Sequence, residues 1–169
     1  MANNINVHVH FDDELSPLSP QEQFIIDEFK LYKSDSLSIS LDNFVAPNEG
    51  IQAKEASIHS LFGRDRVFDF PPEFWARIHQ ENLGHVHYDI DNEWTAQLAQ
   101  WDCTSNSSVV YSGFVLDDEH FHFVIHELLI DDNQKENFDA HDYYQKDDLK
   151  YYLDNAEYYR KVISEQVSS

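Results

Sequence analysis

The chain has 169 residues, 41% of them hydrophobic and 14% aromatic, which excludes a disordered protein and predicts one folded domain over residues 1–169. Its 32 acidic and 11 basic residues give a net charge of −21, which opposes binding to free nucleic acid. No segment approaches the roughly 20 apolar residues needed to span a bilayer, and without a basic region followed by an apolar run near residue 1 we expect no secretory signal. The single cysteine, Cys103, excludes an intramolecular disulfide, so we expect a cytoplasmic protein without membrane contact.

The acidic residues are spread along the chain, and the middle of the sequence is its least acidic part. That part contains Arg64, Arg66 and Arg77, so we expect any anion site to lie there. The acidity has two interpretations: a solubilising or salt-adapted surface, or a surface that binds a basic protein. Composition alone leaves both open.

The first third of the chain predicts a strand followed by a helix. Apolar and polar residues alternate over residues 5–11, the period of a strand with one buried face. Ser19-Pro20-Gln21-Glu22 has the pattern of a capping box and begins a helix of about three turns that ends at Lys33. Residues 34–57, rich in Ser, Asp and Asn, are predicted to be an insertion or irregular excursion.

The remainder predicts a short helix, three strands and a long helix. Apolar residues at 74, 75 and 78 indicate a short helix that ends before Gly84. Strands are expected over 85–90, 108–116 and 121–130, the last two as a hairpin. Helical spacing then runs over residues 140–165. The fold class is therefore α+β: a mostly antiparallel sheet of about four strands, with the N-terminal helix and the long C-terminal helix packed on one face.

Two histidines and an arginine have the chemistry of an RNA-cleaving site. Residues two apart in a strand point the same way, so His85 and His87 project together. Metal-independent cleavage of RNA needs a base, an acid and a cation for the phosphate, and imidazole and guanidinium are suitable groups. We predict His85, His87 and Arg64 as catalytic residues. The alternative is that the histidines are hydrogen-bonded surface groups.

Four further residues are candidates for the same site. Gly63 is expected to take a positive φ that directs Arg64 outward, with Asp65 orienting the arginine or capping the next element of the chain. Tyr111 is predicted to donate a hydrogen bond into a site on the sheet, or to be a packing residue. His141, at the start of the last helix, either contacts phosphate or caps the helix.

Histidine also recurs at strand spacing in His8-Val9-His10 and His120-Phe121-His122, with His126 further along. Such pairs have the geometry of metal ligands, but zinc needs three or four that converge, and the sequence does not show which strands adjoin. No phosphate-binding glycine loop, nucleophile elbow, zinc-finger spacing or dinucleotide fingerprint is present. We therefore assign no metal and no cofactor.

Several segments occur in an order that resembles the YafO family of bacterial type II toxins. The segment 61–69, Leu-Phe-Gly-Arg-Asp-Arg-Val-Phe-Asp, resembles its Phe-Gly-Arg-Asp motif, and Leu83-Gly84-His85-Val86-His87 resembles its Leu-x-His-Ile-His-Leu strand. Residues 103–106 and 109–111 are similar to its Arg-Thr-Ser-Asp and Leu-Val-Tyr, although Cys and Asn replace the arginine and the last aspartate. Asp139-Ala140-His141 is similar to the segment that opens the closing helix, and Leu31-Tyr32-Lys33 to one that precedes the Gly-Arg-Asp motif.

This resemblance implies a RelE-like fold and an mRNA interferase that cleaves mRNA on the ribosome and is neutralised by a cognate antitoxin. On that basis Arg66, Asp65, His141 and Ser105 are predicted to bind substrate. The ribosome would supply substrate positioning. The oligomeric state stays open, a homodimer included. The alternative is a non-catalytic acidic binding protein, such as a nucleic-acid mimic on a toxin-like fold.

Overall fold

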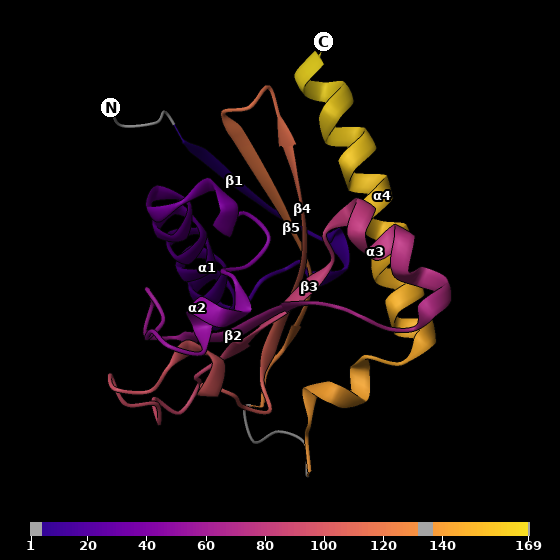
Figure 1. The fold of residues 1–169 in the computed structure, drawn as a ribbon. Coiled ribbons are helices and arrows are strands. Elements are labelled where there is room, and N and C mark those ends of the chain that lie inside the picture. The colour runs from indigo at the N-terminus through magenta and orange to yellow at the C-terminus, as the bar shows by residue number, and fades with distance from the viewer. Residues whose placement is uncertain (1–4, 132–136, 169) are drawn as a thin grey trace.

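A computed structural model describes residues 5–131 and 137–168 of the chain (Figure 1). They form a five-stranded sheet in the order β1-β5-β4-β3-β2. Each neighbouring pair is antiparallel except β1 and β5, which are parallel. The predicted α+β class is confirmed, with one more strand than expected and one parallel pair.

The helices and strands follow one another along the chain in the order of their labels. The strands are β1 Asn6–Phe11, β2 Phe62–Val67, β3 Gly84–Tyr88, β4 Ser108–Leu116 and β5 His120–Leu129. The α-helices are α1 Pro20–Ile39, α2 Glu49–Gln52, α3 Trp75–Glu81 and α4 Lys146–Ser168. Short 3₁₀ helices cover Asp13–Leu15, Leu41–Asn43, Pro72–Phe74, Gln100–Asp102 and Ala140–Tyr143.

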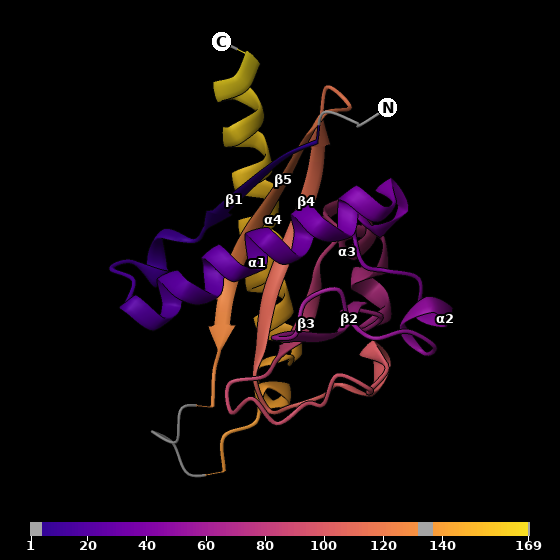
Figure 2. The ribbon, with the colours of Figure 1, turned by 90° about the vertical axis from the view of Figure 1, so that its left-hand side faces the viewer.

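Helices cover both faces of the sheet, so the prediction of a single covered face was wrong. Figures 1 and 2 show α1 on one side of the strands, and α3 and α4 on the other. The strand period explains the two layers, because successive side chains point to opposite faces. On β4, Val109 and Tyr111 join the core beneath α1, while Val110 joins the core beneath α4.

Helix α1 begins as the sequence predicts and ends six residues later than Lys33. The Ser19 side chain accepts from the backbone N–H of Glu22, and the Glu22 side chain accepts from that of Ser19. Beyond Lys33, the hydroxyl of Ser38 donates to a carbonyl one turn back, and Leu37 is buried at 1% exposure. The serine-rich composition indicated an irregular segment, but tertiary burial of the apolar face decides the helix end.

Strand β2, which contains the Gly-Arg-Asp segment, was not predicted because it lacks alternating apolar residues. Its outer edge is paired with a side chain: the amide of Gln52 donates to Asp65 O at 2.9 Å and accepts from Asp65 N at 3.1 Å. No glycine among the described residues has a positive φ, so the expectation for Gly63 was wrong. Gly63 is needed for space instead, because a Cβ there would lie 2.1 Å from the carbonyl oxygen of Cys103.

Candidate functional site

The site begins with two histidines on β3, the strand next to the edge strand β2. Strand β3 directs Val86 and Tyr88 into the core beneath α1, and directs His85 and His87 to the opposite face. Their ring centroids are 6.0 Å apart. Both imidazoles therefore lie on one face, as strand spacing predicts, and on the α4 side of the sheet.

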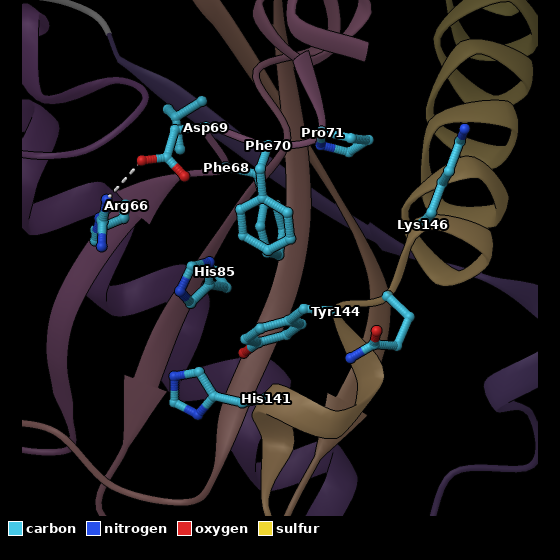
Figure 3. Close-up of a pocket in the computed structure, with 11 residues that line it drawn as sticks. Arg66, Phe68, Asp69, Phe70, Pro71, His85, His141, Tyr144 and Lys146 are labelled. Carbon is cyan, nitrogen blue, oxygen red and sulfur yellow. Dashed lines mark hydrogen bonds and ion pairs between the residues drawn. The ribbon is translucent and has the colours of Figure 1, made fainter. Parts of the chain in front are cut away.

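His85 is enclosed by aromatic rings. Its centroid lies 4.5 Å from that of Phe68 and 4.8 Å from that of Tyr144, and Figure 3 shows it between Tyr144 and Arg66. Burial is the main cause that lowers the pKa of His85 to about 3, and the neighbouring His87 and Arg66 contribute to this shift. The ring is neutral at physiological pH, and its buried Nδ1 has no hydrogen-bond partner among residues 5–131 and 137–168.

His87 is anchored by the loop that precedes β4. Its Nδ1 lies 3.0 Å from the backbone nitrogen and 2.9 Å from the carbonyl oxygen of Ser105, so either tautomer finds a partner there. Burial is the main cause that lowers the pKa of His87 to about 4. Because the loop holds Nδ1, Nε2 is the atom available to a substrate.

Two arginines of β2 lie on the same face as the histidines. Arg66 pairs in register with His85, and Arg64 is close enough to the histidines for its positive charge to lower the pKa of both. The Arg64 Nε donates to Trp101 O at 2.7 Å, and its guanidinium carbon lies 4.3 Å from the Trp101 ring centroid. Arg66 is ion-paired with Asp69 at 3.1 Å, whereas Arg64 has no carboxylate partner within the described part of the chain.

Asp65 and Tyr111 lie on the other face, so the structure does not bring them to the histidines. Lys33 Nζ lies 2.9 Å from Asp65 Oδ2 and 2.9 Å from Tyr111 Oη, and Tyr32 donates to Asp65 at 2.8 Å. Tyr111 donates to Asp65 as well. Burial raises the pKa of both tyrosines well above its ordinary value and lowers that of Lys33, although Asp65 opposes the latter change.

This buried network holds β2 from the α1 side of the sheet. Sequence reasoning did not predict that Lys33 is its cation. Lys33 is fully buried and its side chain also donates to Val45 O at 2.9 Å. A signal was available in α1, where the lysine follows the buried ring of Tyr32 and lies four residues after the buried ring of Phe29. A lysine inside an apolar helix face needs a buried acid as its partner.

The last two predicted residues, His141 and Ser105, differ in the group that each brings to the site: a side chain for His141 and the backbone for Ser105. His141 lies in the 3₁₀ helix before α4, with ring centroids of His141 and His87 6.1 Å apart. Its Nδ1 is 2.8 Å from Asp139 Oδ1, which also accepts from the backbone N–H of His141 and so caps the helix. Ser105 turns its hydroxyl away to donate to Tyr88 O at 2.7 Å, so its backbone is the part that contacts His87.

The histidine pairs of β1 and β5 form a separate ladder of stacked rings: His8, His10, His120 and His122. Nε2 of His8 is 2.8 Å from Nδ1 of His120, and the His10–His122 pair repeats the contact at 3.1 Å. His8 stacks on His122 with centroids 4.5 Å apart. Within residues 5–131 and 137–168, no group of three or more His, Cys, Asp or Glu could hold a metal ion.

The described residues thus define a small α+β protein that gathers two arginines and three histidines on one side of its sheet. Residues 30–161 match the family described as toxin YafO of type II toxin–antitoxin systems. The chain belongs to this family, which gives it the role of a toxin and implies a cognate antitoxin as partner. No curated protein and no solved structure matches it. None of the helices in the described residues is long and apolar enough to cross a membrane.

Proposed function

We propose that this toxin is a metal-independent endoribonuclease, a RelE-like mRNA interferase that cleaves mRNA on the ribosome and so inhibits translation in the cytoplasm. The observation that carries the proposal is the position of Arg64. This cation has no carboxylate partner among the described residues, and its positive charge is one of the causes that lower the pKa of His87, whose ring centroid lies 6.1 Å from that of His141.

The proposed reaction is attack of a ribose 2′-oxygen on the adjacent phosphorus, with loss of the 5′-oxygen of the next nucleotide. Nε2 of His87 takes the proton of the 2′-hydroxyl, and His141 gives a proton to the leaving oxygen. Asp139 orients His141 by accepting from its Nδ1, which leaves Nε2 to face the substrate. Arg64 binds the phosphate, where negative charge develops. The products are a 2′,3′-cyclic phosphate and a 5′-hydroxyl.

The pKa of His87 suits it to begin as a base. A pKa of about 4 keeps the ring neutral in the free protein, because burial disfavours its charged form. A phosphate bound by Arg64 brings negative charge next to the ring and raises this pKa, so Nε2 becomes a stronger base once substrate is present. His85, with a pKa of about 3, stays neutral and is a hydrogen-bonding group rather than a proton donor.

The ribosome has a physical task in this proposal. A net charge of −21 repels free RNA, and at physiological salt this repulsion acts over about 8 Å. Placing mRNA in the decoding centre holds the reacting nucleotide in position, so the protein needs only a local cation at the phosphate. We expect little cleavage of free RNA.

Inducible expression in bacteria tests the function. Wild type is expected to arrest growth and to produce 5′-hydroxyl ends in translated mRNA, whereas His87→Ala and Arg64→Ala are expected to lose both effects. Arg77→Ala is the matched control, since Arg77 lies on α3 in ion pairs with Asp154 and Glu157. Growth arrest without cleaved mRNA would refute the nuclease and favour the acidic binding protein.

A further inference from the structure

A cavity of about 420 Å³ opens beside the proposed catalytic residues, with His141 in its lining, and most of its lining takes no part in the proposed reaction. It lies between the segment after β2, with Phe68 and Phe70, and the segment that leads into α4, with Tyr144 and Lys146 (Figure 3). His85 lines it as well. Its volume is in the range of pockets that bind small organic ligands.

The lining is aromatic and includes an exposed ring. Phe68 is buried, and its ring makes edge-to-face contacts with Phe70 at 6.3 Å and with Tyr144 at 5.0 Å. Phe70 is 44% exposed, so part of its ring is accessible to a ligand in the cavity. Aromatic surfaces of this kind stack on planar ligands, nucleobases among them.

A polar atom in the cavity has no partner. His85 is 9% exposed, and its Nδ1 is buried without a hydrogen bond in the described protein. Buried polar atoms are nearly always paired, because water no longer compensates for a missing partner. An unpaired, neutral imidazole nitrogen fits a hydrogen-bonding edge of an uncharged ligand.

The charges at the rim are already compensated. Arg66 is ion-paired with Asp69 at 3.1 Å, and Lys146 is ion-paired with Glu73. An inorganic anion would have to compete with these carboxylates, whereas a neutral planar ligand would not. The unpaired cation, Arg64, is near Arg66, because their guanidinium carbons lie 4.3 and 5.6 Å from the centroid of the same Trp101 ring. A nucleotide whose base enters the cavity can therefore direct its phosphate to Arg64.

From these observations we propose that the cavity is a nucleobase pocket, in which Phe70 stacks on a base of the mRNA and His85 hydrogen-bonds to its edge. The identity of the base that fits would set which codon positions are cut. This proposal rests on the proposed function for its biological ligand, although binding of the base itself requires neither the ribosome nor cleavage.

The test is titration of the purified full-length protein with the four ribonucleoside 5′-monophosphates, ribose 5-phosphate and inorganic phosphate. Binding is followed by calorimetry and by the imidazole nitrogen resonances of His85. At least one nucleotide is expected to bind at least tenfold more tightly than ribose 5-phosphate and to shift the Nδ1 resonance. Equal binding of all six compounds, or no shift of Nδ1, would overturn the proposal; the former would leave an anion site only.

Substitutions separate the pocket from general folding effects. Phe70→Ala is expected to weaken nucleotide binding about tenfold, from the loss of one stacking partner. Phe24→Ala is the matched control, because Phe24 is 48% exposed on α1, on the opposite face of the sheet, and should leave binding unchanged. His85→Phe keeps the ring but removes both nitrogens, so it should lose binding while its thermal transition shows that it folds.

The outcomes also separate this proposal from the nuclease. If a nucleotide binds as expected but wild type cleaves no mRNA in cells, the pocket stands and the nuclease fails. If wild type cleaves mRNA but Phe70→Ala leaves both nucleotide binding and the distribution of cleavage sites unchanged, the nuclease stands and the pocket fails.

Discussion

The buried ion pair behind β2 offers a sharp prediction about stability. Replacing Lys33 by Met keeps the apolar stem and removes the charge that lies 2.9 Å from Asp65, where both side chains are 0% exposed. Two unit charges at that separation attract by about 6 kcal/mol at an effective dielectric constant of about 20. Since loss of one partner leaves a buried charge, we expect Lys33→Met to cost about 3–5 kcal/mol of unfolding free energy.

This cost is a large part of the stability of a domain, which is about 5–15 kcal/mol in total. Equilibrium unfolding in guanidinium chloride measures it directly. The double variant Lys33→Met/Asp65→Asn removes both charges, so it should cost less than the sum of the single variants by about 2 kcal/mol or more. Lys150→Met is the control: this lysine is exposed and paired with Asp154, and its loss should cost under about 0.5 kcal/mol.

Two results would refute this reasoning. A loss below about 1 kcal/mol for Lys33→Met would show that the pair does not hold α1 to β2. Additive losses in the double variant would show that Lys33 and Asp65 do not interact in the folded state, whatever their individual costs.

Three further predictions concern the rest of the fold. Burial lowers the pKa of His126 to about 3, so as the pH falls below 6.5 this histidine takes up a proton in the unfolded protein before it does in the folded one. The unfolding free energy of wild type should therefore fall by about 2 kcal/mol between pH 7 and pH 5 because of His126. Guanidinium titrations at the two pH values should show that His126→Gln removes this part of the pH dependence. Gly63→Ala places a Cβ 2.1 Å from the Cys103 carbonyl oxygen and should cost about 2–3 kcal/mol, seen as a lower Tm. Arg160→Ala leaves the Glu81 carboxylate, 4% exposed, without its two contacts of 2.8 and 2.9 Å, and should cost about 2–3 kcal/mol in the same assay.

Each of these predictions has a matched control and a contradicting result. His79→Gln changes an exposed histidine, so its free energy of unfolding should stay within about 0.5 kcal/mol of that of wild type. Gly50→Ala meets no atom closer than 3.1 Å and should leave the Tm unchanged or raise it slightly. Lys161→Ala removes an exposed pair with Glu157 and should cost under about 0.5 kcal/mol. A test variant that behaves like its control contradicts the corresponding prediction.

Sequence patterns predicted the elements whose apolar residues repeat at a clear period. The β4–β5 hairpin is confirmed, with Asp117 and Asp118 at positive φ in its turn, and so is the capped start of α1. Strand β2 escaped prediction because charged residues occupy both of its faces and Gln52 supplies its outer partner from a distant helix. Such partners depend on tertiary contacts, which a local pattern does not contain.

The candidate site was also predictable only in part, because a sequence pattern shows local periodicity but not tertiary contacts. Strand spacing correctly placed His85 and His87 on one face, because that period is local. The side of the sheet to which Tyr111 belongs depends on how β4 pairs with β3, and Tyr111 lies opposite Gly84 with its ring beneath α1. The burial of Lys33 depends on the fold of residues 40–57 as well, since Val45 supplies one of its acceptors.

The Gly-Arg-Asp segment therefore has three separate tasks, one for each residue. Gly63 allows the close approach of Cys103, Arg64 faces the histidines, and Asp65 points to the opposite face, where Lys33 neutralises it. A carboxylate on the arginine's own face would cancel the cation that the proposed reaction needs. Because Asp65 has a buried partner of its own, Arg64 keeps its charge for a phosphate in a protein whose net charge is −21.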